Sequence, residues 1–132
     1  MKTLAQPDID AIDIASVFSA LSEPTRLAIC LMLADNEPVE ARCSSFNHLA
    51  TASNLTYHFT RLREAGVTRA RQQGTSRYIS LRREDLDRRF PGLLDAVLDA
   101  ARRSRNSLPI IDMTEDEPEA EGLVRRRTEK QA

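Results

Sequence analysis

The chain has 132 residues, a length that fits one compact domain with tails and argues against a two-domain enzyme. Aromatic residues make up 5% of the chain and tryptophan is absent, so the core must come mainly from Leu, Ile, Val and Ala on helices. Such a core is modest, and dimerisation would extend it. The formal net charge is -1, which by itself gives no reason to expect nucleic acid as a partner.

The charges are unevenly distributed. Residues 1–40 carry 2 basic and 7 acidic side chains, residues 41–105 carry 13 and 6, and residues 106–132 carry 4 and 7. Most of the central excess lies in residues 53–83, where 7 arginines face the single acid Glu64, for a net charge of +6. A concentrated basic stretch is typical of a phosphate-contacting surface, although an ordinary solvated face has the same composition.

Membrane and export signals are missing from the sequence. No apolar run approaches the roughly 18 residues that span a bilayer, and the first residues lack the pattern of a secretory signal. We therefore expect a cytoplasmic protein with no membrane partner. Cys30 and Cys43 are too few for a disulfide scaffold, which agrees with a reducing compartment.

The N-terminal part of the chain predicts an arm and a first helix. Residues 1–7 have no periodic pattern and predict a flexible arm. Asp8 or Asp10 can then cap a helix. Its apolar residues recur at i, i+3, i+4 and i+7 and form one stripe: Ile14, Val17, Phe18 and Leu21.

A second helix is expected to be central and largely buried. Ser22 is a good N-cap, and Pro24 suits the first helical turn because its missing N–H has no partner to lose there. One apolar stripe of this helix contains Leu27, Cys30, Leu31 and Ala34. Residues 35–43 then predict a connection, followed by a short helix over residues 43–48.

The next segment combines a helix with a hairpin. Thr51 or Ser53 can cap a helix over residues 52–65, and Gly66 supplies a left-handed stop. Beyond it, VTRARQQ and SRYISL predict two short strands joined around Gly74 and Thr75. Strands this short need a neighbouring helix to be stable.

The C-terminal part predicts two further helices and a tail. Residues 83–90 have a helical pattern, and Pro91 can open a last helix whose apolar stripe is Leu94, Val97, Leu98 and Ala101. Residues 106–132 contain prolines, an acidic run and a basic triplet, which predict a disordered charged tail. The folded domain should therefore cover residues 8–105.

The predicted order is helix, turn, helix, glycine stop and hairpin. In this order a helix and a hairpin lie side by side, so that one can enter the major groove of DNA while the other follows the backbone. On the helix, short polar side chains can approach base edges and arginines can pair with guanine or phosphate. The predicted DNA-contacting residues of the helix are Ser53, Asn54, Thr56, Tyr57, Thr60, Arg61 and Arg63. Those of the hairpin are Arg69, Arg71, Gln73, Thr75 and Arg77.

Four segments together resemble the ArsR-type winged-helix repressors: FSALSEPTRLAICLML, SNLTYHFTRLREAGV, RQQGTSRYISL and LRREDLDRRFPGLL. The similarity covers about residues 17–98, and Thr56, Tyr57 and His58 stand in place of the family's common Ser-His-His. The resemblance implies a mainly α fold with a small β-hairpin, that is, a winged helix-turn-helix that dimerises through its first and last helices. It also implies a homodimeric repressor on a pseudo-palindromic operator, released by an effector.

The matching faces for such a dimer are Ile14, Val17 and Leu21 from the first helix, with Leu94, Val97, Leu98 and Ala101 from the last. An alternative is that these stripes only complete the core of one chain. Periodicity cannot separate the two interpretations.

The family's metal-sensing elements have no counterpart here. Cys43 lacks a paired cysteine, and the last helix has no histidine to join Asp95 and Asp99. A zinc site needs three or four spaced ligands, so we expect no metal and no cofactor.

Three single residues suggest roles of their own. Cys30 lies on a buried stripe and should be a core residue. Cys43 follows Arg42, whose charge could favour the thiolate, so a redox switch at Cys43 is a hypothesis. His58 shares a face with apolar residues and should be a half-buried hydrogen-bonding residue.

The sequence thus predicts a sequence-specific, double-stranded-DNA-binding transcription regulator. A small-molecule effector is implied by the resemblance alone, and the sequence leaves open whether one exists. No catalytic triad or glycine-rich phosphate loop is apparent, so we do not expect an enzyme. A winged-helix protein–protein interaction or dimerisation module without DNA binding is the alternative, because fold alone does not settle function. The basic segment of residues 53–83 favours DNA.

Overall fold

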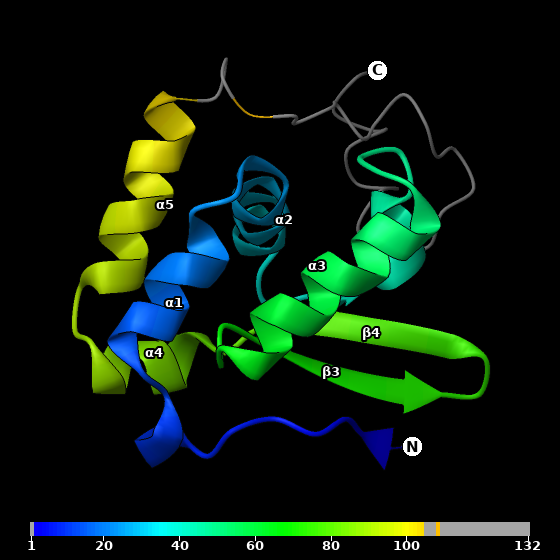
Figure 1. Cartoon of the computed structure of the whole chain (residues 1–132), viewed down its shortest axis with the longest axis horizontal. Helices are drawn as coiled ribbons and strands as arrows, with labels where there is room; N and C mark the ends of the chain where they lie inside the picture. The colour runs from blue at the N-terminus through cyan, green and yellow to red at the C-terminus, as the bar shows by residue number, and fades with distance from the viewer. Residues whose placement is uncertain (1, 105–107, 109–132) are drawn as a thin grey trace.

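The computed structural model describes residues 2–104 and 108, which form an α+β fold (Figure 1). Figure 1 shows α3 crossing in front of the β3–β4 hairpin, with α1, α2 and α5 gathered beside and behind it. In chain order the elements are β1 (Lys2–Thr3), the 3-10 helix η1 (Ile9–Ala11), α1 (Ile14–Leu21), α2 (Pro24–Asp35), β2 (Ala41–Arg42), the 3-10 helix η2 (Cys43–Phe46), α3 (Ala52–Glu64), β3 (Thr68–Gln73), β4 (Ser76–Leu81), α4 (Arg83–Arg89) and α5 (Leu93–Arg103). This architecture confirms the predicted fold class, a winged helix-turn-helix.

The first two helices begin slightly later than their sequence signals suggest. Asp13 caps α1, and its carboxylate accepts a hydrogen bond from the Ser16 N–H at 3.0 Å. The predicted caps Asp8 and Asp10 lie at η1 instead. Glu23 caps α2 in place of Ser22. These shifts of one or a few residues arise because several neighbouring oxygen-bearing side chains compete for the free N–H groups of a first turn.

The helix and hairpin that carry the predicted DNA contacts form where the sequence indicates. Thr51 caps α3 by accepting a hydrogen bond from the Asn54 N–H at 3.2 Å. Gly66 ends the helix with a φ of +86°, in the left-handed region that glycine favours. The two-residue turn of the hairpin contains Gly74, with a φ of +62°.

The N-terminal segment departs from the predicted flexible arm. Lys2–Thr3 forms β1, an edge strand antiparallel to β3, and the Leu4 N–H donates to the Ala70 carbonyl at 2.9 Å. On the other side, β2 pairs with β4, which gives the strand order β1-β3-β4-β2. Strands of two residues have no periodicity to detect, and they form here because each edge of the hairpin offers unpaired backbone groups.

The structure divides the predicted dimer stripes between the core and the surface. Five of those side chains are buried within the single chain: Val17, Leu21, Leu94, Leu98 and Ala101. Ile14 is 38% exposed, and Val97 is partly buried. Phe18, on the same helix, is 52% exposed. For the five buried residues the structure therefore supports the alternative, a role in the monomer core.

The C-terminal end lies largely beyond the described residues. The predicted disordered tail, residues 106–132, falls outside them apart from Leu108, which packs against the core. Within the described part, no single helix is long and apolar enough to cross a membrane. Helices α1 and α2 reach that composition only as a pair, and the pair is bent by 98°.

Candidate nucleic-acid interface

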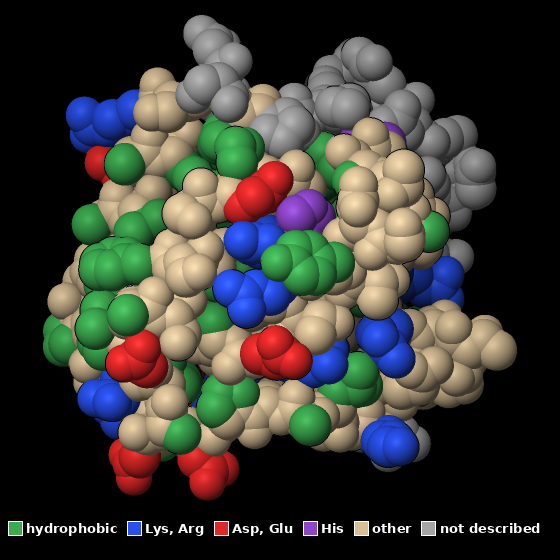
Figure 2. Space-filling model, viewed as in Figure 1, with side chains coloured by type: hydrophobic (Ala, Val, Ile, Leu, Met, Phe, Trp, Pro, Cys, Tyr) green, Lys and Arg blue, Asp and Glu red, His purple; other side chains and the backbone are tan. Residues whose placement is uncertain are grey.

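The outer face of α3 carries short polar side chains. Its inner face packs into the core through Leu55 and Leu62, which a helical turn of about 100° per residue places on one side. The first half of the helix therefore exposes Ser53, Asn54, Thr56 and Tyr57. Tyr57 is 56% exposed. Figure 2 shows this face, with Lys and Arg side chains gathered in its middle over α3.

A groove of about 380 Å³ separates the first half of α3 from the hairpin. Its lining combines polar and apolar side chains and includes one cation, Arg77. The lining residues are Cys43, Ser44, Asn47, Ala52, Leu55, Thr56, Phe59, Gln72, Thr75 and Arg77. Sequence reasoning missed Ser44 and Asn47, because no local pattern places the segment around η2 beside α3. It also missed Gln72, an uncharged residue of β3 whose position opposite Arg77 follows only from the strand register.

The strand register separates the hairpin arginines. Arg77 is opposite Gln72 and shares its face, which borders the groove beside α3. Arg71 is opposite Tyr78, and alternation along β3 places Arg69 and Gln73 with Arg71 on the other face. The structure thus brings Arg77 together with α3, but not Arg69, Arg71 or Gln73. The two-residue turn already contained this information, because turn length sets the register.

The arginines on the far face of the hairpin are held by carboxylates. Arg71 donates hydrogen bonds to the Glu40 carboxylate from Nε at 3.0 Å and from a terminal nitrogen at 2.7 Å. Its guanidinium also lies 4.5 Å from the centre of the Tyr78 ring. The hydrogen bond to Glu40 raises the pKa of Arg71 above its ordinary value. Arg69 contacts Asp85 at 3.2 Å. Because carboxylates already compensate both charges, these arginines are poorly suited to neutralise phosphates.

The second half of α3 faces the N-terminal part of the chain. A terminal nitrogen of Arg61 lies 3.4 Å from the Ser19 hydroxyl, and Arg63 donates from Nε to the Ala5 carbonyl at 3.0 Å. Both arginines and Thr60 are half-buried. The side chains at these three positions are therefore less free to extend towards DNA than those at the start of the helix.

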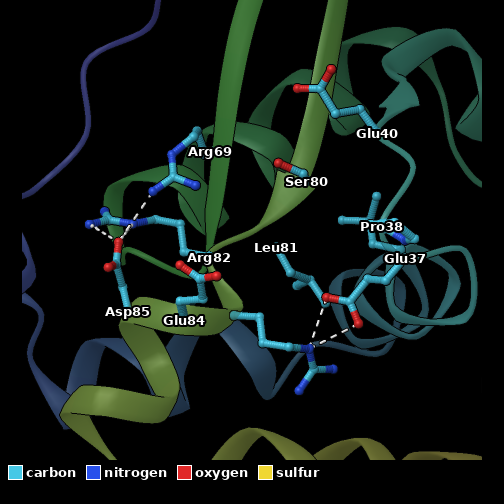
Figure 3. A pocket seen from close by; sticks show the side chains of 11 residues that line it. Glu37, Pro38, Glu40, Arg69, Ser80, Leu81, Arg82, Glu84 and Asp85 are labelled. Atoms are coloured by element: carbon cyan, nitrogen blue, oxygen red, sulfur yellow. Dashed lines mark hydrogen bonds and ion pairs between the residues drawn. The ribbon is translucent and has the colours of Figure 1, made fainter.

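A second cavity, of about 530 Å³, lies behind the hairpin at the beginning of α4 (Figure 3). Its arginines are paired with its own carboxylates: Arg69 and Arg82 with Asp85, and Arg83 with Glu37 at 2.9 Å. The hydrogen bond to Glu37 raises the pKa of Arg83. Arg69 and Ser80 line this cavity, so it opens on the face of the hairpin opposite Arg77.

The thiol of Cys43, the residue of the redox hypothesis, is partly buried near Arg77 and Arg63. Burial raises the pKa of its thiol to about 11, because the loss of hydration outweighs the attraction of Arg77 and Arg63 for a thiolate. A reactive thiolate is therefore disfavoured. Cys30 is fully buried in α2, and burial raises the pKa of its thiol to about 12, as suits the predicted core residue.

Metal ligands do not gather in the described part of the chain, where no three His, Cys, Asp or Glu side chains lie close enough to hold an ion. His58 has the expected hydrogen-bonding contact, 3.0 Å from Arg26, but it is buried, at 9% exposure, where a half-buried position was expected.

The fold and the exposed unit of helix, groove and hairpin define a winged helix-turn-helix protein. The chain is similar to the uncharacterized HTH-type transcriptional regulator YceK of Bacillus subtilis, with 35% identity over 85 residues that cover 63% of this chain and 84% of YceK. It is also similar to the uncharacterized HTH-type transcriptional regulator MJ1325 of Methanocaldococcus jannaschii, with 34% identity over 62 residues, or 46% and 68% of the two chains. No family model matches the sequence. The chain belongs to the HTH-type transcriptional regulators and is a DNA-binding regulator.

Proposed function

We propose that this regulator is a repressor of the ArsR type that binds a pseudo-palindromic operator as a homodimer. In this proposal the first half of α3 enters the major groove, where Ser53, Asn54, Thr56 and Tyr57 read base edges. Thr60, Arg61 and Arg63 contact the backbone near the end of the helix. Arg77 and Thr75 hold the sugar-phosphate backbone from the hairpin side.

One observation carries the proposal: Arg77 lies across a groove of about 380 Å³ from the exposed start of α3. In this proposal one sugar-phosphate strand of the DNA lies in the groove between α3 and the hairpin. Its neutral hydroxyl and amide groups, from Ser44, Asn47 and Gln72, can donate hydrogen bonds to phosphate oxygens. A cation and a set of short polar groups at one surface suit a duplex better than an apolar partner.

The exposed apolar side chains of α1 support the homodimer. Ile14 and Phe18 are one helical turn apart and lie on the surface of the single chain. On α5, Leu93 and Val97 are also one turn apart and only partly buried. Figure 2 shows hydrophobic side chains over both helices, at the left. We propose that these outward residues, rather than the buried part of each stripe, form the dimer contact.

The cavity behind the hairpin is our candidate place for the effector that the ArsR resemblance implies. Its volume of about 530 Å³ falls within the range of small-molecule sites, roughly 300–1,000 Å³. Leu33, Pro38 and Leu81 provide apolar surface beside the paired charges. A ligand here would contact both strands of the hairpin and the beginning of α4.

The test compares two exposed arginines of the same hairpin. Binding of the full chain to a duplex from upstream of its own gene is measured by fluorescence anisotropy at several salt concentrations. We expect Arg77→Ala to weaken binding to every sequence and to reduce the slope of log K against log salt by about 1, because one phosphate contact is lost. Arg69→Ala, on the opposite face, should leave the slope unchanged. Equal slopes for both variants and the native chain would overturn the proposed orientation.

Base reading is tested separately from backbone contact. We expect Asn54→Ala to reduce the preference for the operator over a scrambled duplex by about 1–3 kcal/mol, because the Asn amide can make a bidentate base contact. Thr56→Ala should reduce it less, because one hydroxyl makes a single contact. The affinity for the scrambled duplex should change little. A dimer that binds neither duplex, even at low salt, would favour a protein-interaction module instead.

A further inference from the structure

Arg26, in the first turn of α2, is a buried cation that connects three helices. It is 6% exposed. Its Nε donates to the Ala20 carbonyl at 2.7 Å, and a terminal nitrogen lies 3.5 Å from the Ser19 carbonyl, both at the C-terminal end of α1. The other terminal nitrogen lies 3.0 Å from Nδ1 of His58 on α3. A buried guanidinium is tolerated when acceptors meet its donors, and here the end of α1 and His58 provide three such acceptors.

The contact with Arg26 determines which ring nitrogen of His58 carries a proton. Arginine has donors and no acceptor, so Nδ1 must be the acceptor and carry no proton. The neutral ring therefore carries its proton on Nε2, which lies 4.0 Å from a Glu23 carboxylate oxygen. That oxygen also accepts a hydrogen bond from the backbone N–H of Arg26 at 2.9 Å. Nδ1 of the ring thus contacts the Arg26 guanidinium, and Nε2 faces the Glu23 carboxylate.

This contact lies directly beneath the reading surface. His58 follows Tyr57 on α3, and the Arg26 guanidinium carbon is 5.8 Å from the centre of the exposed Tyr57 ring. Apolar packing alone allows a helix to slide or turn slightly, because dispersion contacts have little directionality. A charged hydrogen bond to one ring nitrogen specifies both distance and direction.

We propose that Arg26 is a positioning residue of α3: it holds His58 in the Nε2–H tautomer and thereby sets the rotation of the helix against the end of α1. This rests on the proposed function, in which α3 reads the operator. Because Ser19 and Ala20 belong to α1, the same contact ties the reading helix to a helix that we assign to the dimer. Arg26 itself does not touch DNA in this arrangement.

The first test needs no DNA. Nitrogen-15 NMR of the histidine rings in the full chain distinguishes a protonated from an unprotonated ring nitrogen, and His48→Asn assigns the two histidine signals. At neutral pH we expect His58 to show Nε2 protonated and Nδ1 unprotonated, and Arg26→Gln to produce a mixture of tautomers. An Nδ1–H tautomer, or a mixture in the native chain, would overturn the proposal even if DNA binding is normal.

The second test uses two substitutions of His58 that differ in one acceptor. In His58→Asn the amide oxygen takes the place of Nδ1 and can still accept from Arg26, whereas His58→Leu keeps the apolar bulk and has no acceptor. We expect His58→Leu to lower the ratio of operator to scrambled-duplex affinity about tenfold, the equivalent of one hydrogen bond to a charged group. His58→Asn should retain most of that ratio.

The two tests separate the failure of this inference from failure of the proposed function. Equal ratios for His58→Leu and His58→Asn would overturn the positioning role while leaving operator binding intact. A native chain that binds no DNA but shows the Nε2–H tautomer would reject the proposed function and keep the Arg26–His58 contact. If His58→Leu fails to fold, as judged by its circular dichroism, the NMR result alone decides.

Discussion

Among single residues, Cys43 shows how burial overrides a neighbouring charge. In the sequence it follows an arginine, and in the structure Arg77 and Arg63 also attract a thiolate. The half-buried thiol nevertheless keeps its proton, because the lost hydration of the anion is the larger effect. Exposure is a property of the folded chain, and the residue next in sequence does not determine it.

We predict that Cys43 of the folded protein reacts slowly with iodoacetamide at pH 8, and that its rate keeps rising with pH and levels off only near pH 11, the approximate pKa of the thiol. The same protein in urea serves as the control, since an exposed thiol ionises at lower pH. Peptide mapping distinguishes Cys43 from Cys30. Equal rates for Cys43 in the folded and unfolded chain would contradict the prediction.

The raised pKa of the Cys43 thiol also makes the stability of the protein depend on pH. Because the pKa of the Cys43 thiol is higher in the folded chain, the folded state binds more protons than the unfolded state once the unfolded thiol ionises. The contribution to the free energy of unfolding is therefore complete at neutral pH and is lost as the pH rises towards about 11.

At the scale of elements, the end of α3 depends on one glycine. Gly66 has a φ of +86°, and a Cβ built there would lie 2.7 Å from Cγ1 of Ile12. Ile12 is 1% exposed and belongs to the hydrophobic core, so displacing its side chain would disturb the packing around it. The close approach places the segment before α1 against the joint between α3 and the hairpin.

We predict that Gly66→Ala destabilises the protein more than Gly74→Ala. Both positions have positive φ, which costs a side chain about 1–3 kcal/mol. Only Gly66 adds a collision, because nothing lies within 4 Å of a Cβ at Gly74. Thermal unfolding followed by circular dichroism gives the comparison, and similar melting temperatures for the two variants would show that the contact with Ile12 is unimportant.

At the scale of the whole molecule, the arrangement of α1 and α5 leaves an apolar surface on a single chain. Phe18 is 52% exposed, although its neighbour Val17 is buried. An exposed aromatic side chain beside Ile14 is expected where a second chain covers it. A dimer formed there would present two copies of α3 to one duplex, as a palindromic operator requires.

We predict that Phe18→Asp prevents formation of the proposed dimer and thereby weakens binding to the proposed operator. Since the side chain is exposed in the single chain, the monomer fold should survive. Val39→Asp is the matched control, because Val39 is 42% exposed and lies away from α1 and α5 in the sequence. Size-exclusion chromatography with light scattering measures the mass, and a Phe18→Asp dimer of native affinity would refute this interface.

The local signals of the sequence located the elements that bear the proposed site. A cap at Thr51, apolar spacing at Leu55 and Leu62 and a stop at Gly66 predicted α3, and turn residues predicted the hairpin. The candidate face of α3 followed from helical geometry alone. Strand alternation would also have separated Arg77 from Arg71, but the prediction treated the hairpin arginines as one set.

What the sequence by itself determined is the order of elements, their approximate ends and the apolar face of each helix, because these depend on residues a few positions apart. Only the tertiary structure decided which part of each apolar stripe is buried, that residues 2–3 extend the sheet, that Ser44 and Asn47 border the groove, and that Arg26 reaches His58. The physical reason is distance along the chain. Those contacts join residues far apart in sequence, and their energies depend on burial and direction that exist only after the helices have packed.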